Sequence, residues 1–300
     1  MRAANLPIQL HPRMPAIDAF IALGDAGLVA VADQLDALHR RDHPDDVHAL
    51  RVAVRHLRAV CWAFAPALPK AIRARWDDCL RKLAQAASDV RDWDVFVSET
   101  LRPALDLEPE DPVLLAVQDT AITRRHYARA TMLAQLTEYQ HWPLPVLHRD
   151  LTHLNRGGVQ GAGSAAKDHL AEFASRRVCR GRKRVKSLAR AARSQDLARV
   201  HRFRIGSKRL RYVIEALKPV LPARYAKRLH RKLVKRQGSL GGLIDGVVAR
   251  RLMMECLNMP AKDAAGATDA TDATDATDAA GATDVPGAAV APDRSATISP

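Results

Sequence analysis

The chain has 300 residues, with 47 Lys and Arg against 33 Asp and Glu, which gives a formal net charge of +14. No apolar run approaches the roughly 18 residues of a membrane span, and the N-terminus lacks the compact apolar stretch of a secretory signal. The four cysteines lie far apart and form no CxxC or Cys/His spacing, which argues against a zinc motif or a disulfide framework. We therefore expect a cytoplasmic protein.

Alanine supplies much of the apolar fraction, and the body of the chain shows helical periodicity broken at Pro and Gly. Since no alternation typical of strands stands out, the sequence predicts an all-α fold. The expected helices are 17–40, 46–64, 70–88, 93–102, 112–138, 165–193, 197–217, 223–237 and 243–257.

Prolines and glycines mark the expected breaks. Pro44, followed by Asp45 and Asp46, is typical of a helix start, and Pro103 is expected to end the fourth helix. Residues 141–163 hold two Pro and several Gly, which predicts an irregular linker. We expect an N-terminal extension over 1–14, a helical domain over 15–258 with halves at about 15–140 and 164–258, and a disordered tail over 259–300.

Charge is distributed unevenly between this tail and the body. The tail contains ATDATDATDATD (267–278), a low-complexity run without a large apolar residue. Residues 260–300 hold Lys262 and Arg294 against seven Asp, a net charge of −5, which leaves +19 on residues 1–259. So basic a body predicts a polyanionic partner: nucleic acid, an anionic membrane or inorganic phosphate chains. The tail is interpreted as a solubilising appendage, with weak screening of the body as the alternative.

An internal repeat relates the two halves. HALRVAVRHLR (48–58) matches HRFRIGSKRLR (201–211) at an offset of 153 residues, with the basic positions in register. At the same offset Lys82 aligns with Lys235, and Asp92 aligns with Asp245. The repeat predicts a duplicated four-helix unit.

Both copies gather basic side chains on one side of a helix. At about 100° per residue, the four basic residues of the first copy fall within an arc of about 80°, opposite an apolar face. Like charges stacked at these spacings destabilise a helix, so the charge indicates a function, with an ordinary solvated face as the alternative. The stripes are His48, Arg51, Arg55 and Arg58, and then His201, Arg204, Lys208 and Arg211 with Tyr212 at the edge.

Duplicated halves commonly pack about a pseudo-two-fold axis, so we expect the two stripes to face each other across a shared groove or channel. Convergent cations concentrate positive potential there. Arginine grips phosphate oxygens in bidentate fashion, and lysine acts as a point charge. The two histidines add donors that strengthen as the pH falls toward their pKa.

These residues resemble the CHAD family, the conserved histidine α-helical domain. That family pairs an H-x-x-R-[VI]-x-x-[RK]-x-x-R helix with a later R-D-x-D-V or L-G-x-x-x-D element in each half. Here the first pair is 48–58 with RDWDV (91–95), and the second is 201–212 with LGGLID (240–245). The resemblance covers about residues 15–258, and the first copy departs from the pattern at Ala59, where the second has Tyr212.

The resemblance implies two pseudo-symmetric four-helix bundles around a basic central channel that binds inorganic polyphosphate, and association with polyphosphate granules in bacteria. Family members are often fused to a CYTH-type triphosphatase domain, but no ExExK motif occurs here, so we expect a stand-alone domain. The expected polyphosphate-binding residues are His48, Arg51, Arg55, Arg58, Lys82, His201, Arg204, Lys208, Arg211, Tyr212 and Lys235.

Several candidates keep a plainer interpretation. Lys82 and Lys235 are nearly as well explained as solvent-facing lysines. Asp92 and Asp245 are interpreted as structural, capping a helix or holding a neighbouring arginine, rather than as a metal or acid/base pair. The basic runs 176–186 and 227–236 define no single face and fit an auxiliary polyanion surface or a solubilising run equally well. The remaining candidates, interpreted as ordinary surface residues, are His56, His126 and His230.

Nothing in the sequence supplies a nucleophile with its base, so we predict a non-enzymatic binding protein without a cofactor or metal. RNA or DNA is the rival ligand, although aromatic stacking platforms are scarce and no recognised nucleic-acid motif is present. A phosphatase or kinase acting on polyphosphate is the third hypothesis, and it lacks a P-loop and an acidic metal cluster.

Overall fold

The computed structural model describes residues 9–141, 143–157, 163–194 and 196–257. The expected tail over 259–300 and most of the N-terminal extension lie outside these residues. Apart from an isolated bridge between Pro15 and His169, the regular structure in the described part is helical, as predicted. None of its helices is long and apolar enough to cross a membrane.

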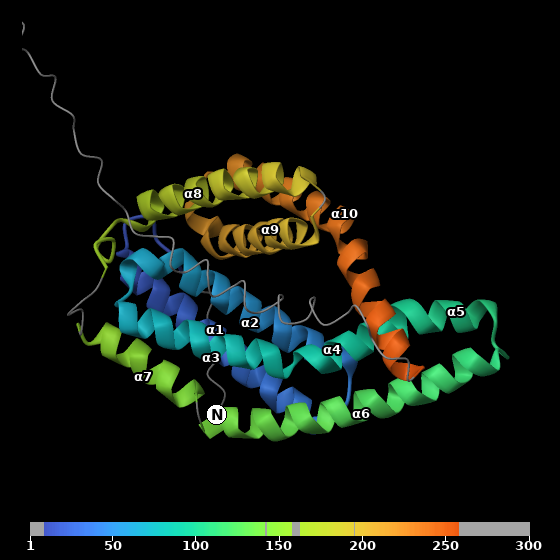
Figure 1. Cartoon of the computed structure of the whole chain (residues 1–300). Helices are drawn as coiled ribbons and strands as arrows, with labels where there is room; N and C mark the ends of the chain where they lie inside the picture. The colour runs from blue at the N-terminus through green and yellow to red at the C-terminus, as the bar shows by residue number, and fades with distance from the viewer. Residues whose placement is uncertain (1–8, 142, 158–162, 195, 258–300) are drawn as a thin grey trace, which may run out of the picture.

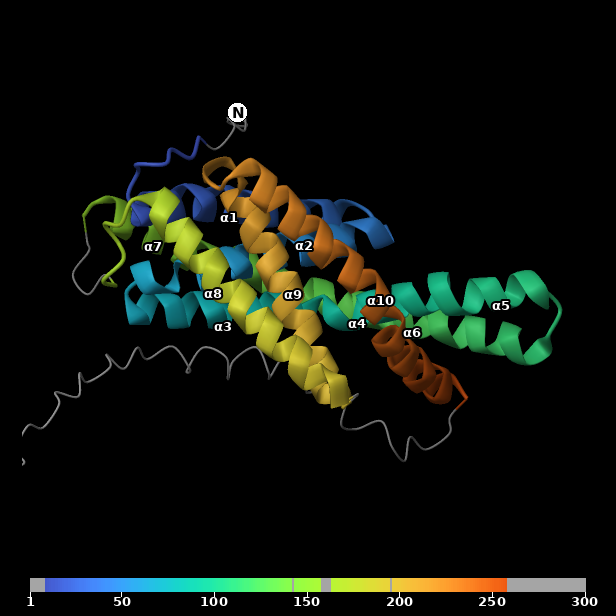
Figure 2. The same cartoon turned by 90° about the horizontal axis from the view of Figure 1, so that it is seen from above.

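The α-helices are α1 (Ala16–Arg40), α2 (Pro44–Phe64), α3 (Lys70–Ala86), α4 (Ser88–Val95), α5 (Arg102–Leu107), α6 (Pro112–His141), α7 (Leu144–Asn155), α8 (Leu170–Ala191), α9 (Leu197–Leu217) and α10 (Ala223–Cys256). They form two main layers, with α8, α9 and the first part of α10 lying over α1, α2 and α3 (Figure 1). Seen from above, α8, α9 and α10 cross over α1 and α2 (Figure 2). The α5 end of the molecule, with the adjoining part of α6, extends beyond the layers as an arm.

Capping side chains fix where the two repeated helices begin. At the start of α2, the backbone N–H of Asp45 donates to the His43 ring at 3.2 Å, and Pro44 occupies the first turn. At the start of α9, the backbone N–H of Arg199 donates to the Asp196 carboxylate at 3.0 Å. Each cap satisfies a donor that has no partner inside the helix. The boundaries of α2 and α9 therefore follow from local sequence.

One continuous hydrophobic core joins the two halves of the chain. Within the lower layer, the Phe20 and Trp76 rings meet edge to face with centroids 5.2 Å apart. Between the layers, Phe64 of α2 stacks on Phe173 of α8 at 5.0 Å. All four side chains belong to the same buried cluster. Since large aromatic rings contribute strongly to burial energy, this contact fixes α8 over α2.

α10 differs from the prediction. It runs without interruption over Ala223–Cys256, where two helices at 223–237 and 243–257 were expected. Its C-terminal end belongs to a second core, in which Leu252 and Cys256 pack with Trp93 of α4 and Val117 of α6. Packing at both ends offsets the weak helix propensity of the glycines between them. α10 thereby links α9 to the arm.

Two further breaks were placed wrongly. Residues 141–163 are not wholly irregular, because α7 forms with Pro145 in its first turn and buries Leu147 and Leu151. Pro103 does not end the fourth helix: a π-helix over Phe96–Leu101 leads directly into α5, which carries Pro103 in its first turn. Pro103 therefore lies inside a continuous helical run, directly after a π-helical segment in which the regular hydrogen-bond pattern is already interrupted. Within the expected linker, residues 158–162 lie outside the described part.

Candidate functional site: the basic seam between α2 and α9

The two repeated helices pack side by side. The His56 ring of α2 lies 4.2 Å from the Tyr212 ring of α9, measured between centroids. The His56 Nε2 atom is also 3.5 Å from the carboxylate of Glu215. We call this interface the α2–α9 seam. The two predicted stripes lie on its helices, and Arg55 of α2 is an electrostatic neighbour of Arg204 and Arg211 of α9. The stripes are His48, Arg51, Arg55 and Arg58 on α2, and His201, Arg204, Lys208 and Arg211 on α9.

The helix faces opposite these stripes are buried, as the periodicity predicts. Leu50, Val54 and Leu57 of α2 are at most 1% exposed, and Leu210 and Leu217 of α9 are equally inaccessible. The basic residues of the seam are half-buried, except His48, which is exposed. Cations held in such a wall act on an anion more strongly than cations on an open surface, because less water screens them.

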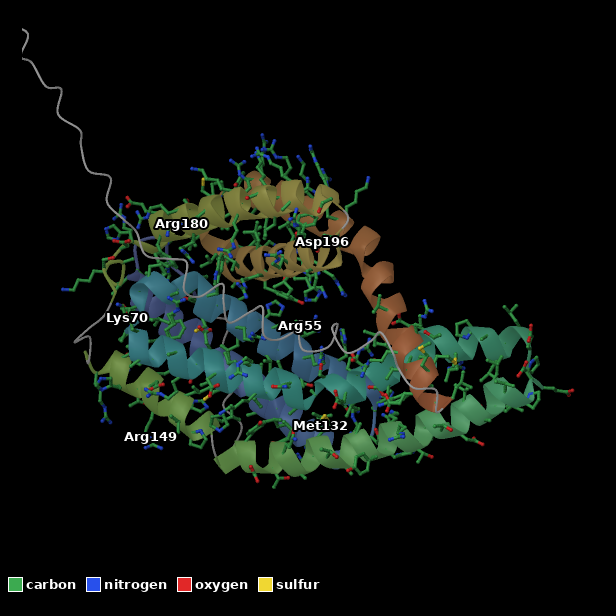
Figure 3. All side chains as sticks on the ribbon, viewed as in Figure 1. Arg55, Lys70, Met132, Arg149, Arg180 and Asp196 are labelled. Atoms are coloured by element: carbon green, nitrogen blue, oxygen red, sulfur yellow. The ribbon has the colours of Figure 1, made fainter. Side chains whose placement is uncertain are left out.

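Arg55 marks where positive charge gathers in the seam. Burial lowers the pKa of its guanidinium, and the neighbouring charges of Arg211, Arg204 and Arg91 lower it further. These neighbours come from α9 and α4, so cations of three helices lie near one another around Arg55. Arg55 is held there by a hydrogen bond from its Nε to the carbonyl of Arg51 at 3.0 Å. It lies on the side of α2 nearer α9 (Figure 3).

The two helices of the seam carry few acidic residues of their own. Residues 47–64 contain no Asp or Glu, and residues 197–217 contain only Glu215. The Glu215 carboxylate accepts a hydrogen bond from His230 Nε2 at 2.6 Å and lies 3.5 Å from Arg211 Nε. One carboxylate thus serves Arg211 and two histidines. Taken by themselves, α2 and α9 therefore carry an excess of positive charge, and Asp92 of α4 lies near Arg51.

Two histidines of α2, His48 and His56, have lowered pKa values. Burial lowers the pKa of His48, and the charges of Arg91 and Arg55 lower it further. Burial also lowers the pKa of His56, while Glu215 acts in the opposite direction. Both rings are therefore held toward the neutral form near pH 7, and a bound anion would favour the protonated form.

Tyr212 forms part of the seam wall. The side chain is buried, with 4% of its surface exposed, and the guanidinium of Arg211 lies 4.6 Å from its ring centre. A cation over an aromatic face is attracted to it. The structure therefore gives Tyr212 a role in positioning Arg211, in addition to its predicted place at the edge of the stripe.

The two predicted lysines lie away from the centre of the seam. Lys82 Nζ is 3.0 Å from Asp78, and Lys82 also lines a hollow of about 670 Å³ that holds Asp92 and Arg251. Its ion pair leaves less charge for an external anion. Lys235 is exposed on α10, about 200° around the helix from the buried Leu233.

The roles of three residues in this region were not predicted from the sequence. Arg91 lies in the RDWDV element, which was the available signal, but its closeness to His48 and Arg55 appears only in the fold. His56 and His230 were interpreted as ordinary surface residues, and the structure adds that both contact Glu215. No local sequence pattern predicts that His56 and His230 share the Glu215 carboxylate, since the three residues come from α2, α10 and α9.

Asp92 takes one of the two structural roles expected for it. It lies within α4 rather than at its N-terminus, and its carboxylate is 3.5 Å from Arg251 of α10. Burial raises its pKa, and the positive charge of Arg51 opposes that shift. Asp92 therefore holds a neighbouring arginine at the edge of the seam. The side chain of Asp245 lies outside the described part.

The basic run on α8 points in several directions around the helix, so it defines no single face. Arg177 points inward: it is 8% exposed, lies 4.8 Å from the Trp62 ring centre and donates to the Trp62 carbonyl at 2.9 Å. Burial lowers its pKa to about 10. Arg180, Lys183 and Lys186 are exposed instead. Arg177 therefore anchors α8 on α2, and its exposed neighbours face solvent.

Comparison with known proteins agrees with this architecture. The model of the CHAD domain matches residues 23–253. The fold is similar to the crystal structure of the CHAD domain from the plant Ricinus communis, with a TM-score of 0.65, 23% identity and 92% of each chain covered. It is also similar to PptA from Streptomyces chartreusis, with a TM-score of 0.56, 15% identity, and 88% of this chain and 93% of that chain covered. None of the curated proteins matches the sequence.

Proposed function

Because the chain belongs to the CHAD domain family, we propose that it is a non-enzymatic protein that binds inorganic polyphosphate in the α2–α9 seam. The observation that supports this most strongly is the convergence of Arg204, Arg211 and Arg91 on Arg55. Like charges brought together in a half-buried wall destabilise the free protein, so their presence favours an anionic ligand. In this proposal α2 and α9 form the walls of a basic channel between pseudo-symmetric halves.

Polyphosphate suits such a seam for chemical reasons. It is a flexible chain of closely spaced negative charges without bases, so it needs cations but no aromatic stacking platforms. Arginine can hold two phosphate oxygens at once, and each such contact is a charge-assisted hydrogen bond. Affinity should also gain from released counterions and should therefore fall steeply as salt is added. The same proposal places the protein on cytoplasmic polyphosphate granules.

The test compares two double variants of the full chain. Arg51→Ala with Arg204→Ala removes one cation from each wall of the seam. Arg149→Ala with Arg156→Ala removes the same charge from exposed positions at α7. Labelled long-chain polyphosphate near physiological salt should bind the seam variant about tenfold more weakly or worse, with the control close to wild type and helicity unchanged in both.

Competition separates the proposal from its rival. Transfer RNA and single-stranded DNA, added at equal phosphate concentration, should leave bound polyphosphate largely in place. Unaltered affinity in the seam variant would refute the assigned site. Equal displacement by nucleic acid would instead make the protein a general polyanion binder.

A further inference from the structure

The layer formed by α8, α9 and α10 is basic on both of its sides. α9 packs on α2 and carries its half of the seam there, whereas α8 and α10 carry exposed cations elsewhere. Nitrogen-tipped side chains project from the upper side of this layer, away from α1–α3 (Figure 3). We call the exposed cations the outer rows. They are Arg180, Lys183, Lys186 and Arg190 on α8, and Arg224, Lys227, Arg228, Arg231, Lys232 and Lys235 on α10.

Helix geometry makes each row a continuous strip. On α10, Ala226 and Leu233 are buried, and Arg224 and Arg231 lie about 160° to 180° around the helix from Leu233. On α8, the exposed row lies about 100° to 160° around the helix from the buried Val185. At 1.5 Å per residue, each row is about 15 Å long. The rows therefore point away from the seam.

The outer rows carry one sign of charge only. Residues 173–194 and 216–244 contain no Asp or Glu. Among the described residues, none of the outer-row cations forms an ion pair, whereas the neighbouring Arg176 pairs with Asp168 and Glu172. Ordinary surfaces mix both signs. A one-sign strip raises the local concentration of polyanions instead.

The chemistry of the rows favours a polyanion without bases. Aromatic residues near them do not offer stacking platforms, because Phe173 of α8 is buried and Tyr225 of α10 is half-buried. Nucleic-acid strands gain much of their affinity from such platforms. A flexible phosphate chain needs only a line of cations, which each row supplies.

We infer that the outer rows bind a second inorganic polyphosphate chain, so that one molecule bridges two chains. This inference rests on the proposed function of the seam, which supplies the first chain. Exposed cations are more strongly screened than half-buried ones, so the outer rows bind more weakly and more salt-dependently than the seam. Two sites on opposite sides of one layer cross-link long chains into a condensed phase by multivalency.

The experiment uses the full chain and two variants of equal charge. The outer-row variant carries Arg180→Gln, Lys183→Gln, Arg228→Gln and Arg231→Gln. The control removes four exposed cations from other parts of the surface, through Arg13→Gln, Arg102→Gln, Arg149→Gln and Arg156→Gln. Titration calorimetry with a short polyphosphate of about ten phosphates counts chains per molecule, and light scattering with a long polyphosphate measures bridging.

Wild type and the control variant should each bind two short chains per molecule, and the outer-row variant should bind one. The affinity of that remaining chain for the seam should be within about twofold of the wild-type value. The light scattering of the outer-row variant with long chains should fall about tenfold. A single short chain on wild type, or undiminished scattering by the outer-row variant, would overturn the bridging inference and leave the seam standing. Displacement of the second chain by transfer RNA at equal phosphate concentration would also overturn it. If neither the short nor the long polyphosphate binds, the proposed function is contradicted as well.

Discussion

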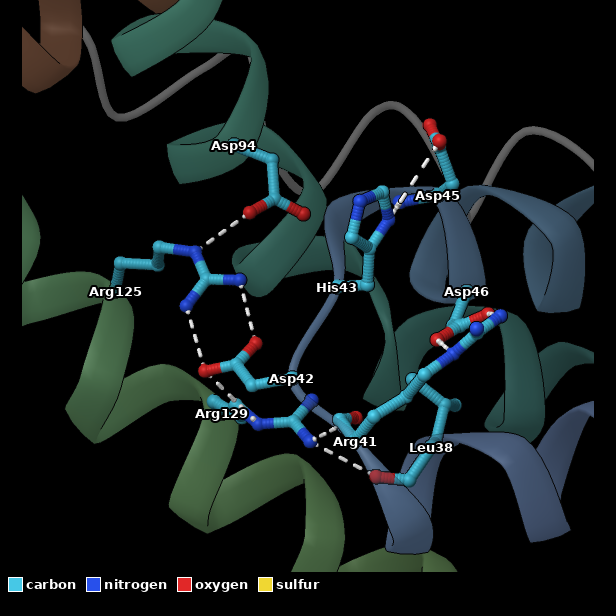
Figure 4. Close-up of polar contacts among 9 residues, drawn as sticks. All are labelled: Leu38, Arg41, Asp42, His43, Asp45, Asp46, Asp94, Arg125 and Arg129. Atoms are coloured by element: carbon cyan, nitrogen blue, oxygen red, sulfur yellow. Dashed lines mark hydrogen bonds and ion pairs between the residues drawn. The ribbon is translucent and has the colours of Figure 1, made fainter.

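At the turn between α1 and α2, arginines are matched by carboxylates (Figure 4). Arg125 Nε donates to Asp94 at 2.7 Å, and its two terminal nitrogens donate to Asp42 at 2.7 and 2.9 Å. Arg129 lies 3.3 Å from Asp42 and donates to two backbone carbonyls. Arg41 pairs with the buried Asp46 at 2.6 Å. We call these residues the turn cluster.

Arginines in the α2–α9 seam have the opposite electrostatic surroundings. In the turn cluster, the hydrogen bond from Arg125 to Asp42 raises the pKa of Arg125. In the seam, burial and neighbouring arginines lower the pKa of Arg55. The turn cluster joins α1, α2, α4 and α6 through internal ion pairs, so its charge serves the fold. The two helices that carry the seam hold only one acidic residue between positions 47–64 and 197–217, and the proposed role of the seam's charge is to bind a ligand.

The largest expected effect is on stability, in the turn cluster. Arg125→Met leaves the Asp94 carboxylate, whose side chain is 1% exposed, without its arginine. Breaking a buried pair from one side should lower the free energy of unfolding by about 3 kcal/mol, because the remaining charge is left buried. Urea denaturation measures this change, and the exposed Arg40→Met should stay within about 0.5 kcal/mol of wild type. Equal stability of the two variants would contradict the structural role of the turn cluster.

Arg55→Met should change function without loss of stability. Polyphosphate affinity should fall about tenfold, because several cations of the seam converge on Arg55. The free energy of unfolding should not fall by more than about 0.5 kcal/mol, since a half-buried charge among like charges has been removed. Calorimetric binding and urea denaturation report the two quantities. A large loss of stability with unchanged affinity would reverse the assigned roles of the two regions.

Lower pH should raise the affinity for polyphosphate and lower the folding stability of the ligand-free protein. Burial lowers the folded-state pKa of His48 and His56, so the unfolded chain takes up these protons at a higher pH than the folded protein does. Stability therefore falls as the pH drops below the unfolded value and through the folded one. A bound phosphate favours the protonated rings, so affinity should rise about threefold or more from about pH 7.5 to 5.5.

Titration calorimetry in buffers of different ionisation enthalpy counts the protons taken up on binding. His48→Gln should reduce this uptake, which separates the contribution of the ring from the titration of polyphosphate itself. Proton release on binding, or an uptake unaffected by His48→Gln, would contradict the role of His48 in the seam.

Tyr212→Phe should have the smallest effect. The ring is buried and lies beside His56 and Arg211, so its shape matters more than its hydroxyl. Phenylalanine keeps that shape, and affinity should stay within about twofold of wild type. A loss beyond about fivefold would mean that the hydroxyl itself contacts phosphate.

The features that could be predicted from sequence are local ones. The stripes of α2 and α9 follow from helical spacing, and the start of α2 follows from Pro44 and the acidic residues after it. The repeat also led us to expect that the two stripes face each other across a groove, which stays a prediction. The contact between His56 and Tyr212 shows that the two helices that carry the stripes pack together.

Features that depend on distant contacts were missed. The glycines near 238–242 favour a break, yet α10 continues because Leu252 packs on a second core far from α9. In the sequence, Arg177 is one of several residues in a basic run. Only the fold shows that it contacts the ring and the backbone carbonyl of Trp62 on α2. The role of Glu215 likewise requires His56 and His230, which only the fold brings to it. Helix propensity predicts such features only where tertiary packing does not favour a different outcome.

The most direct test of the central claim is a crystal structure of the full chain with a short polyphosphate of about ten phosphates. The account predicts phosphates within hydrogen-bond distance of Arg55 on α2 and Arg204 on α9. Phosphates found only on the exposed sides of α8 and α10, with the α2–α9 seam free of ligand, would contradict it.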